Sequence, residues 1–316
     1  RTKKELRRLY EALCQKAEEF DHVLKMGRTQ MQDAVPIRLG QEFRAYSEAI
    51  RRDIARFERA KDEMRRLNMG GTAIGTGINA DEQYLRRIVP NLSKVTGLNL
   101  VQAFNLIDAT QNLDEFVAVS GAVKTCAVNL SKMSNDLRLM SSGPRTGFGE
   151  INLPARQNGS SIMPGKINPV IPEVVNQVAF NIIGNDVTIT MAAEAGQLEL
   201  NAFEPIIFYN LFESIETLTY AVKTLVDNCI TGITANKEHC RKEVENSIGV
   251  ITAICPYVGY ETAANIAKEA LRTGRQVRDL ILEKGLMDAE QLNTVLNPYT
   301  MTEPGILGKD PMEQLR

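Results

Sequence analysis

Two serines, a lysine and an asparagine lie close together in the segment GSSIMPGKINP, residues 159–169. The segment contains no acidic residue, histidine or cysteine, which are common proton-transfer groups. Lys166 and Asn168 directly precede Pro169 and Pro172, which open an apolar stretch with helical spacing. Because the amide groups of a helix N-terminus attract anions, this combination predicts a carboxylate site, with the serine hydroxyls carried towards it on a mobile flap.

Other interpretations of this segment have to be weighed against a carboxylate site. A phosphate-binding P-loop requires G-x-x-x-x-G-K-[ST], whereas the glycines at positions 159 and 165 are separated by five residues. A nucleophilic serine requires a base within reach. The two histidines, His22 and His239, lie in charged helical contexts and are expected on the surface. A plain linker between helices stays open on composition alone.

The charge balance argues against nucleic acid and membrane partners. The formal net charge is −2, and no apolar run reaches the ~18 residues that a membrane span requires. Arginines are frequent between residues 51 and 66, but they alternate with Asp53, Glu58 and further acidic residues. This mixture predicts a solvated helix face that includes Asp53.

The five cysteines are scattered, and no two of them form a C-x-x-C pair. This pattern predicts reduced thiols in a cytoplasmic protein and argues against a disulfide framework or a zinc site. Cys126 and Cys229 lie in apolar helical surroundings and are expected to be buried. No metal-ligand cluster stands out, and no cofactor is predicted.

Helical periodicity dominates the chain and predicts an all-α fold built on a bundle of long helices. Pro36 is suited to the first turn of one of them, and Gly70 and Gly71 to its end. Strand signals are weak, and the only candidate lies near residues 98–101. The long helices are predicted over residues 36–67, 112–141, 168–195 and 204–229.

The pattern changes near residue 236, which predicts a central bundle domain over residues 1–236 and a small helical domain over residues 237–316. The segment 168–195 is apolar on nearly every side, so it must be buried among other helices. The chain has too few helices to cover it, which predicts a symmetric oligomer. The shorter helices of the second domain are predicted over about 237–247, 259–272, 275–284 and 288–296.

The segment GSSIMPGKINP resembles the signature loop of the aspartase/fumarase superfamily, enzymes that eliminate a C–N or C–O bond to release fumarate. The resemblance extends over essentially the whole chain and implies the long-helix bundle of that fold. Four further blocks are similar to superfamily blocks: KMGRTQMQDAVPIRLGQEF (25–43), GGTAIGTGIN (70–79), NDLRLMSSGPRTG (135–147) and GQLELNAFEP (196–205).

Details within these blocks favour the aspartase branch, with fumarases second. Fumarases usually have GRTH where this chain has Gln30, and GNFELN where it has GQLELN at residues 196–201. The ending NPYTMTEPGILGKD is similar to bacterial aspartases. The resemblance therefore implies a carbon–nitrogen lyase that eliminates ammonia from L-aspartate. Fumarate hydratase and a non-catalytic helical oligomer are the alternatives.

The resemblance also implies residue roles in the loop. The first serine of the superfamily loop acts as general base, which corresponds to Ser160, and Ser161 follows it towards the substrate. Lys166 and Asn168 match the pair that holds the substrate α-carboxylate, one by charge and one by a directed donor. Met163 is expected to support the loop.

Three residues outside the loop complete the implied site. Thr29 and Gln30 match positions beside the departing amine, and Glu173 matches a glutamate that pairs with histidine in fumarases. Because an amide does not titrate, Gln30 is expected to orient the substrate. The alternatives are N-capping of the next helix by Thr29 and Gln30, and an ordinary helical position for Glu173.

Superfamily members carry further substrate contacts in an N-terminal region that nothing here matches. The chain starts at Arg1 in a helical pattern, and we expect on the order of 150 residues to precede it. The resemblance further implies a homotetramer whose active sites are shared between subunits. The 316-residue chain alone is therefore expected to be inactive or nearly so.

Overall fold

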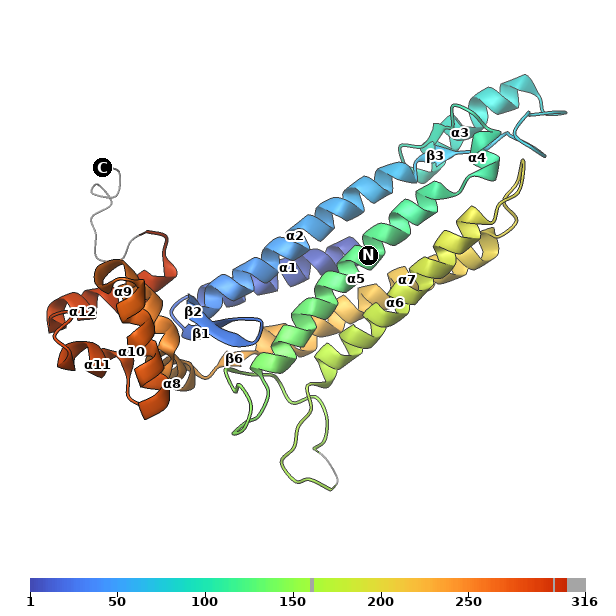
Figure 1. Cartoon of the computed structure of the whole chain (residues 1–316). Helices are drawn as coiled ribbons and strands as arrows, with labels where there is room; N and C mark the ends of the chain where they lie inside the picture. Colours follow the sequence, from blue (N-terminus) through green and yellow to red (C-terminus); the bar gives the residue numbers. More distant parts are fainter. Residues whose placement is uncertain (160–161, 298, 306–316) are drawn as a thin grey trace. The chain divides into compact units, whose positions relative to one another are not determined.

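The computed structural model describes residues 1–159, 162–297 and 299–305, and most of that part is α-helical (Figure 1). The structure is 64% helical, which confirms the predicted all-α class. The long helices are α1 (Thr2–Glu19), α2 (Leu39–Glu63), α5 (Asp114–Met140), α6 (Val170–Glu194) and α7 (Glu204–Asn228). The shorter ones are α3 (Glu82–Thr96), α4 (Asp108–Gln111), α8 (Lys237–Asn246), α9 (Ile251–Val258), α10 (Tyr260–Thr273), α11 (Val277–Glu283) and α12 (Ala289–Val295).

The strands are short and pair two by two in the described residues. β1 (Leu24–Thr29) and β2 (Gln32–Arg38) are antiparallel, as are β5 (Ile151–Asn152) and β6 (Thr234–Ala235), whereas β3 (Arg66–Leu67) and β4 (Val101–Gln102) are parallel. Three 3₁₀ turns cover Ile230–Gly232, Ile248–Val250 and Thr300–Thr302.

The chain divides into two compact units. Unit 1 comprises residues 1–11, 47–138 and 155–231, and unit 2 comprises residues 12–46, 139–154 and 232–316. The predicted domain boundary between residues 236 and 237 stays a prediction.

Three of the four predicted long helices are found with ends within two residues of their predicted limits: α5, α6 and α7. The fourth prediction, residues 36–67, is wrong at both ends, because α2 spans only Leu39–Glu63, with Pro36 in β2 and Leu67 in β3. Pro36 pairs with Met26, and β2 has no second neighbouring strand among the described residues, so the missing N–H of proline is tolerated there.

The β1–β2 hairpin was not expected, since strands were sought only near residues 98–101. Its register shifts between Met26 and Arg28, which marks a bulge. A Cβ at Gly27 would lie 2.6 Å from the carbonyl oxygen of Val35, so the backbones approach closely there. The bulge and Pro36 interrupt the alternation of polar and apolar residues by which strands are recognised. Helix α9 was also missed between two predicted helices.

Polar side chains join the helices of unit 1, in which α2, α5, α6 and α7 run alongside one another (Figure 1). Asn129 of α5 donates hydrogen bonds of 3.0 and 2.9 Å to the two carboxylate oxygens of Asp53 on α2. Ser120 of α5 donates to Asp186 of α6 at 2.7 Å. Asp53 is 0% exposed, so its placement on a solvated face was wrong. Burial raises the pKa of the Asp53 carboxyl above its ordinary value.

Helices α6 and α7 leave large apolar side chains exposed in unit 1. Phe180 and Met191 of α6 are 62% and 66% exposed, and Tyr209 and Phe212 of α7 are each 65% exposed. Both helices also contribute residues to a buried core that includes Ile189 and Leu211. This chain therefore covers only part of the apolar surface of α6, as its composition predicts.

Unit 2 has its own core, formed by one residue of β1 and by residues between positions 244 and 295, most of them on helices α8 to α12. Met26, Val244, Ile254, Ile266 and Leu280 are among its buried members. The burial predicted for two cysteines and the exposure predicted for both histidines are confirmed. Cys126 and Cys229 are buried, all five cysteines are free thiols, and His22 and His239 are exposed.

Candidate active site

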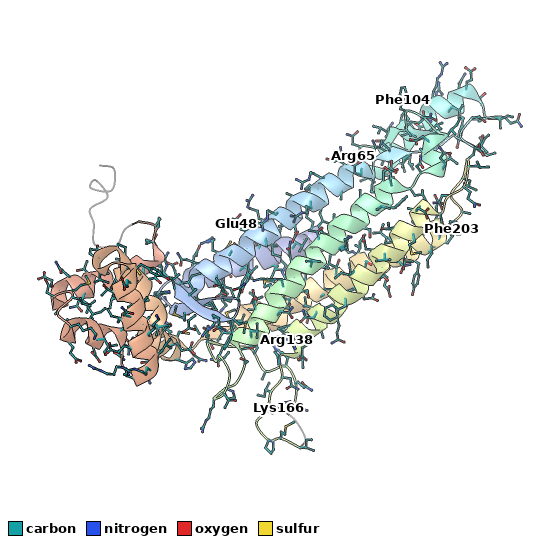
Figure 2. All side chains as sticks on the ribbon, viewed as in Figure 1. Glu48, Arg65, Phe104, Arg138, Lys166 and Phe203 are labelled. Carbon is teal, nitrogen blue, oxygen red and sulfur yellow. The ribbon has the colours of Figure 1, made fainter. Side chains whose placement is uncertain are left out.

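The loop before α6 contains a tight turn that positions Lys166. The carbonyl oxygen of Met163 accepts a hydrogen bond of 3.2 Å from the N–H of Lys166, which closes a turn with Pro164 and Gly165 at its centre. Gly165 has a φ of +83°, as a type II turn requires at that position, and glycine adopts this conformation without a steric penalty. Figure 2 shows Lys166 on this loop.

Lys166 and Asn168 lie at the N-terminus of α6. Pro169 occupies the N-cap position and provides no side-chain hydrogen bond to the first turn, and the carbonyl oxygen of Asn168 accepts from the N–H of Val170 at 2.9 Å. The Lys166 side chain is exposed and makes no ion pair with any residue in the described part of the chain. A cation beside a helix N-terminus can bind a carboxylate.

Glu173, in the first turn of α6, contacts an arginine that the sequence interpretation missed. Arg138 lies near the end of α5 (Figure 2). Its Nη2 lies 3.6 Å from Oε1 of Glu173, and its Nη1 donates to Oδ1 of Asn176 at 3.4 Å. The Nδ2 group of Asn176 donates in turn to the hydroxyl of Ser131 at 2.8 Å. Arg138 belongs to a recognised block, but no spacing rule links it to Glu173, because the two residues meet only when α5 packs against α6.

Ser160 and Ser161 lie outside the described residues, so their predicted roles have no geometry to be compared with. Met163 is exposed, and its carbonyl oxygen closes the turn described above.

Thr29 and Gln30 lie at the tip of the β1–β2 hairpin and are exposed. Thr29 pairs with Gln32, and the two residues between them, Gln30 and Met31, have φ values of 52° and 63°. Two positive φ values in a two-residue loop are typical of a type I′ turn. Thr29 and Gln30 are therefore turn residues and do not cap α2, which begins at Leu39.

The predicted site residues are divided between the two units. Thr29 and Gln30 belong to unit 2, whereas Met163, Lys166, Asn168 and Glu173 belong to unit 1. Each group keeps its own supporting structure: a strained hairpin turn in one unit, and a helix N-terminus with a glycine turn in the other.

Comparison with protein families adds two matches to this geometry. Residues 2–184 match a family described as lyase, and residues 250–303 match the C-terminus of fumarase C. The chain belongs to this lyase family. The predicted aspartase/fumarase superfamily is thereby confirmed.

Relatives of this lyase chain cover nearly all of it. It is 54% identical over 306 residues to aspartate ammonia-lyase of Bacillus subtilis (strain 168). The aligned residues make up 97% of this chain and 64% of that protein. The chain therefore spans slightly less than two thirds of the length of that relative.

Two solved structures share the lyase fold. Fumarate lyase:delta crystallin from Brucella melitensis bound to cobalt has a TM-score of 0.92 and 51% identity, covering 96% of this chain and 66% of that one. Class II fumarase from Schistosoma mansoni has a TM-score of 0.93 and 33% identity, and the match covers 96% of this chain and 67% of the fumarase chain. This agreement supports the fold over the length of the chain.

Two kinds of feature, a membrane-spanning helix and a cluster of metal-binding side chains, are absent from the described residues. No helix there combines the length and the apolar composition needed to cross a membrane. No group of three or more histidine, cysteine, aspartate or glutamate side chains in the same residues is arranged to hold a metal ion.

Proposed function

We propose that the complete protein eliminates ammonia from L-aspartate and releases fumarate. The observation that carries the proposal is the pairing of Lys166 with the N-terminus of α6, where a glycine turn aligns the lysine and Asn168 beside a helix end without a side-chain cap. This arrangement suits a substrate carboxylate. The 54% identity to an aspartate ammonia-lyase supports aspartate as the substrate.

The proposed reaction breaks a C–H bond and a C–N bond on neighbouring carbons. A base removes a proton from the carbon next to the β-carboxylate. The electron pair of the broken C–H bond is delocalised into that carboxylate, which gives an enediolate. The pair then forms the C=C bond of fumarate while the amine leaves as ammonia, which takes up the released proton. Donors aimed at the enediolate supply the main stabilisation, because charge develops there in the transition state.

Ser160 is the proposed base, and its hydroxyl is far too weak an acid to ionise in water at neutral pH. Amide donors and a nearby cation in a site closed to water would stabilise the alkoxide. Lys166 and Asn168 would hold the α-carboxylate, with Ser161 and Met163 supporting the loop. Glu173, already near Arg138, would take a supporting role.

Thr29 and Gln30 are proposed to face the departing amine. Gln30 has no titratable group, so it can orient the amine by hydrogen bonding but cannot protonate it. This property separates the proposed lyase from enzymes that have a histidine at the Gln30 position, paired with a glutamate at the Glu173 position.

Fumarate hydratase is the second candidate, because the C-terminal residues 250–303 match a fumarase family and a class II fumarase shares the fold. Assays of the complete protein with aspartate and with malate distinguish the two. Fumarate formed from aspartate, with at least tenfold lower kcat/KM for malate, supports the proposal, and the reverse preference refutes it.

The functional assembly is proposed to be a cytoplasmic homotetramer with active sites shared between subunits. The exposed apolar residues of α6 and α7, such as Phe180 and Phe212, support burial against other copies of the chain. The 316-residue chain alone is expected to turn over aspartate weakly or not at all. The mass of the complete protein by native mass spectrometry tests the tetramer, and ammonia release tests the isolated chain.

A further inference from the structure

A buried charge cluster in unit 2 supports the strand that leads to the hairpin tip. Its centre is Glu150, whose side chain is 0% exposed. Oε1 of Glu150 accepts a hydrogen bond of 2.5 Å from Arg28, and Oε2 lies 3.1 Å from Nζ of Lys25. Lys25 and Arg28 are both on β1. One carboxylate therefore binds two cations of the strand that carries Thr29.

Arg28 is fixed on three sides. Besides Glu150, its Nη2 group donates to Oε2 of Glu243 on α8 at 3.1 Å. Its guanidinium carbon lies 4.4 Å from the ring centre of Phe148, within the range of a cation–π contact. Burial by itself lowers the pKa of Arg28, but the carboxylates of Glu150 and Glu243 raise it above its ordinary value. The residue next to Thr29 thus has little freedom to move.

Glu150 is itself anchored through its backbone. Its N–H donates to the carbonyl oxygen of Met140 at 2.8 Å, and its carbonyl oxygen accepts from the N–H of Asn236 at 2.9 Å. These contacts join it to the end of α5 and to the residue before α8. Because the backbone of Glu150 is held in this way, its buried carboxylate can fix the position of β1.

The hairpin tip needs such support. Gln30 and Met31 are not glycines, and the left-handed conformation costs each of them about 1 kcal/mol. Such a conformation persists only where the surrounding structure determines it. Arg28 lies two residues before the turn pair, and its Nε lies 3.9 Å from Oδ1 of Asp33, two residues after that pair on β2, so the charge cluster reaches both strands at the turn.

We propose that Glu150 is a positioning residue for the reaction: through Arg28 it holds the hairpin turn so that Thr29 and Gln30 meet the departing amine. This inference rests on the proposed function. It assigns Glu150 no contact with the substrate and no part in proton transfer. Its effect is on the amine side of the site, while the carboxylate side depends on Lys166 and Asn168.

Reversing the reaction separates these two sides, because ammonia and fumarate then enter as distinct substrates. In the complete protein, Glu150→Gln keeps the size of the side chain but removes the charge that fixes Arg28. We expect the KM for ammonia to rise about tenfold while the KM for fumarate changes less than about twofold. If the substitution only reduced the fraction of protein that is folded, the apparent kcat would fall and both KM values would stay unchanged.

Glu42→Gln is the matched control. Glu42 is the other carboxylate partner of Lys25, at 3.0 Å, and has no contact with Arg28 among the interactions described. Both KM values should stay within about twofold of wild type in this variant. If the KM for ammonia rises as much in Glu42→Gln as in Glu150→Gln, loss of any negative charge in the cluster has the same effect, and the inference is overturned.

Arg28→Lys keeps the inference testable if Glu150→Gln does not fold. A lysine retains the positive charge but has a single nitrogen, which cannot bridge Glu150 and Glu243 as the guanidinium does. The same rise in the KM for ammonia is expected. Unchanged KM values in either variant would overturn the inference alone, whereas a wild-type protein inactive on aspartate and fumarate would overturn the proposed function as well.

Discussion

Replacing Asn129 by alanine should destabilise the bundle of unit 1 far more than the loss of an ordinary amide. Asn129 donates to both oxygens of Asp53, at 3.0 and 2.9 Å, and Asp53 is 0% exposed. Arg56 is its other partner, at 2.5 Å. Each hydrogen bond to a charged group contributes about 1.5–3 kcal/mol, and Asn129 supplies two of them to a buried carboxylate that keeps only Arg56 when they are lost. We therefore expect Asn129→Ala to lower the free energy of unfolding by about 3–5 kcal/mol.

The pH dependence of this loss follows from the pKa of Asp53. Burial raises that pKa in the folded state, so the folded chain binds a proton that the unfolded chain has released. The contribution of Asp53 to stability therefore falls as pH rises from its ordinary value through the raised one. Without Asn129 the pKa rises further, so the loss at about pH 5 should be smaller than at about pH 7.

Urea unfolding followed by circular dichroism, at one protein concentration, measures these differences. The double variant Asp53→Asn with Asn129→Ala should recover at least half of the loss, because it removes the buried charge that has lost two of its hydrogen bonds. The matched control is Asn185→Ala, whose amide on α6 donates to the carboxylate of Glu213 at 3.0 Å and to the hydroxyl of Ser214 at 3.1 Å, both on α7. Because Glu213 is only half-buried and water can replace the lost donor, this variant should cost about 1 kcal/mol. A loss below 1 kcal/mol for Asn129→Ala, or the same loss at both pH values, would refute the electrostatic argument.

Three further predictions concern the proposed site and the thiols. Ser160→Ala in the complete protein should lower kcat at least a hundredfold with assembly by native mass spectrometry unchanged, and wild-type turnover would remove Ser160 from the mechanism. Lys166→Met should raise the KM for aspartate at least tenfold, as measured by initial rates; an unchanged KM would contradict its carboxylate role. Burial raises the pKa of Cys229 and Cys240 to about 12, so both should react with Ellman's reagent at about pH 8 only after unfolding in urea. Prompt labelling of either thiol in the folded chain, located by peptide mapping, would contradict that burial.

Local sequence patterns were sufficient for the helices and for part of the site. The long apolar repeats of α5, α6 and α7 extend over many turns, so their ends are predicted within two residues. The loop composition around Pro164 and Gly165 predicts a break in the helix pattern, and the prolines that follow predict a helix start near residue 168, two residues before the observed start of α6. These features depend on residues that are neighbours in the sequence.

The hairpin, the burial of Asp53 and the pairing of Arg138 with Glu173 were decided only by tertiary structure. In the sequence Asp53 lies among arginines, which is typical of a surface residue. In the structure Asn129 of another helix donates hydrogen bonds to both carboxylate oxygens, and these bonds make its burial possible. Glu150 lies outside all the recognised blocks, and its partners Lys25 and Arg28 on β1 are distant from it in the sequence. A helix is stabilised by residues three or four positions apart, which a single sequence displays. A buried charge is stabilised by whichever distant segment supplies the opposite charge or the donor, and only the folded chain shows which segment that is.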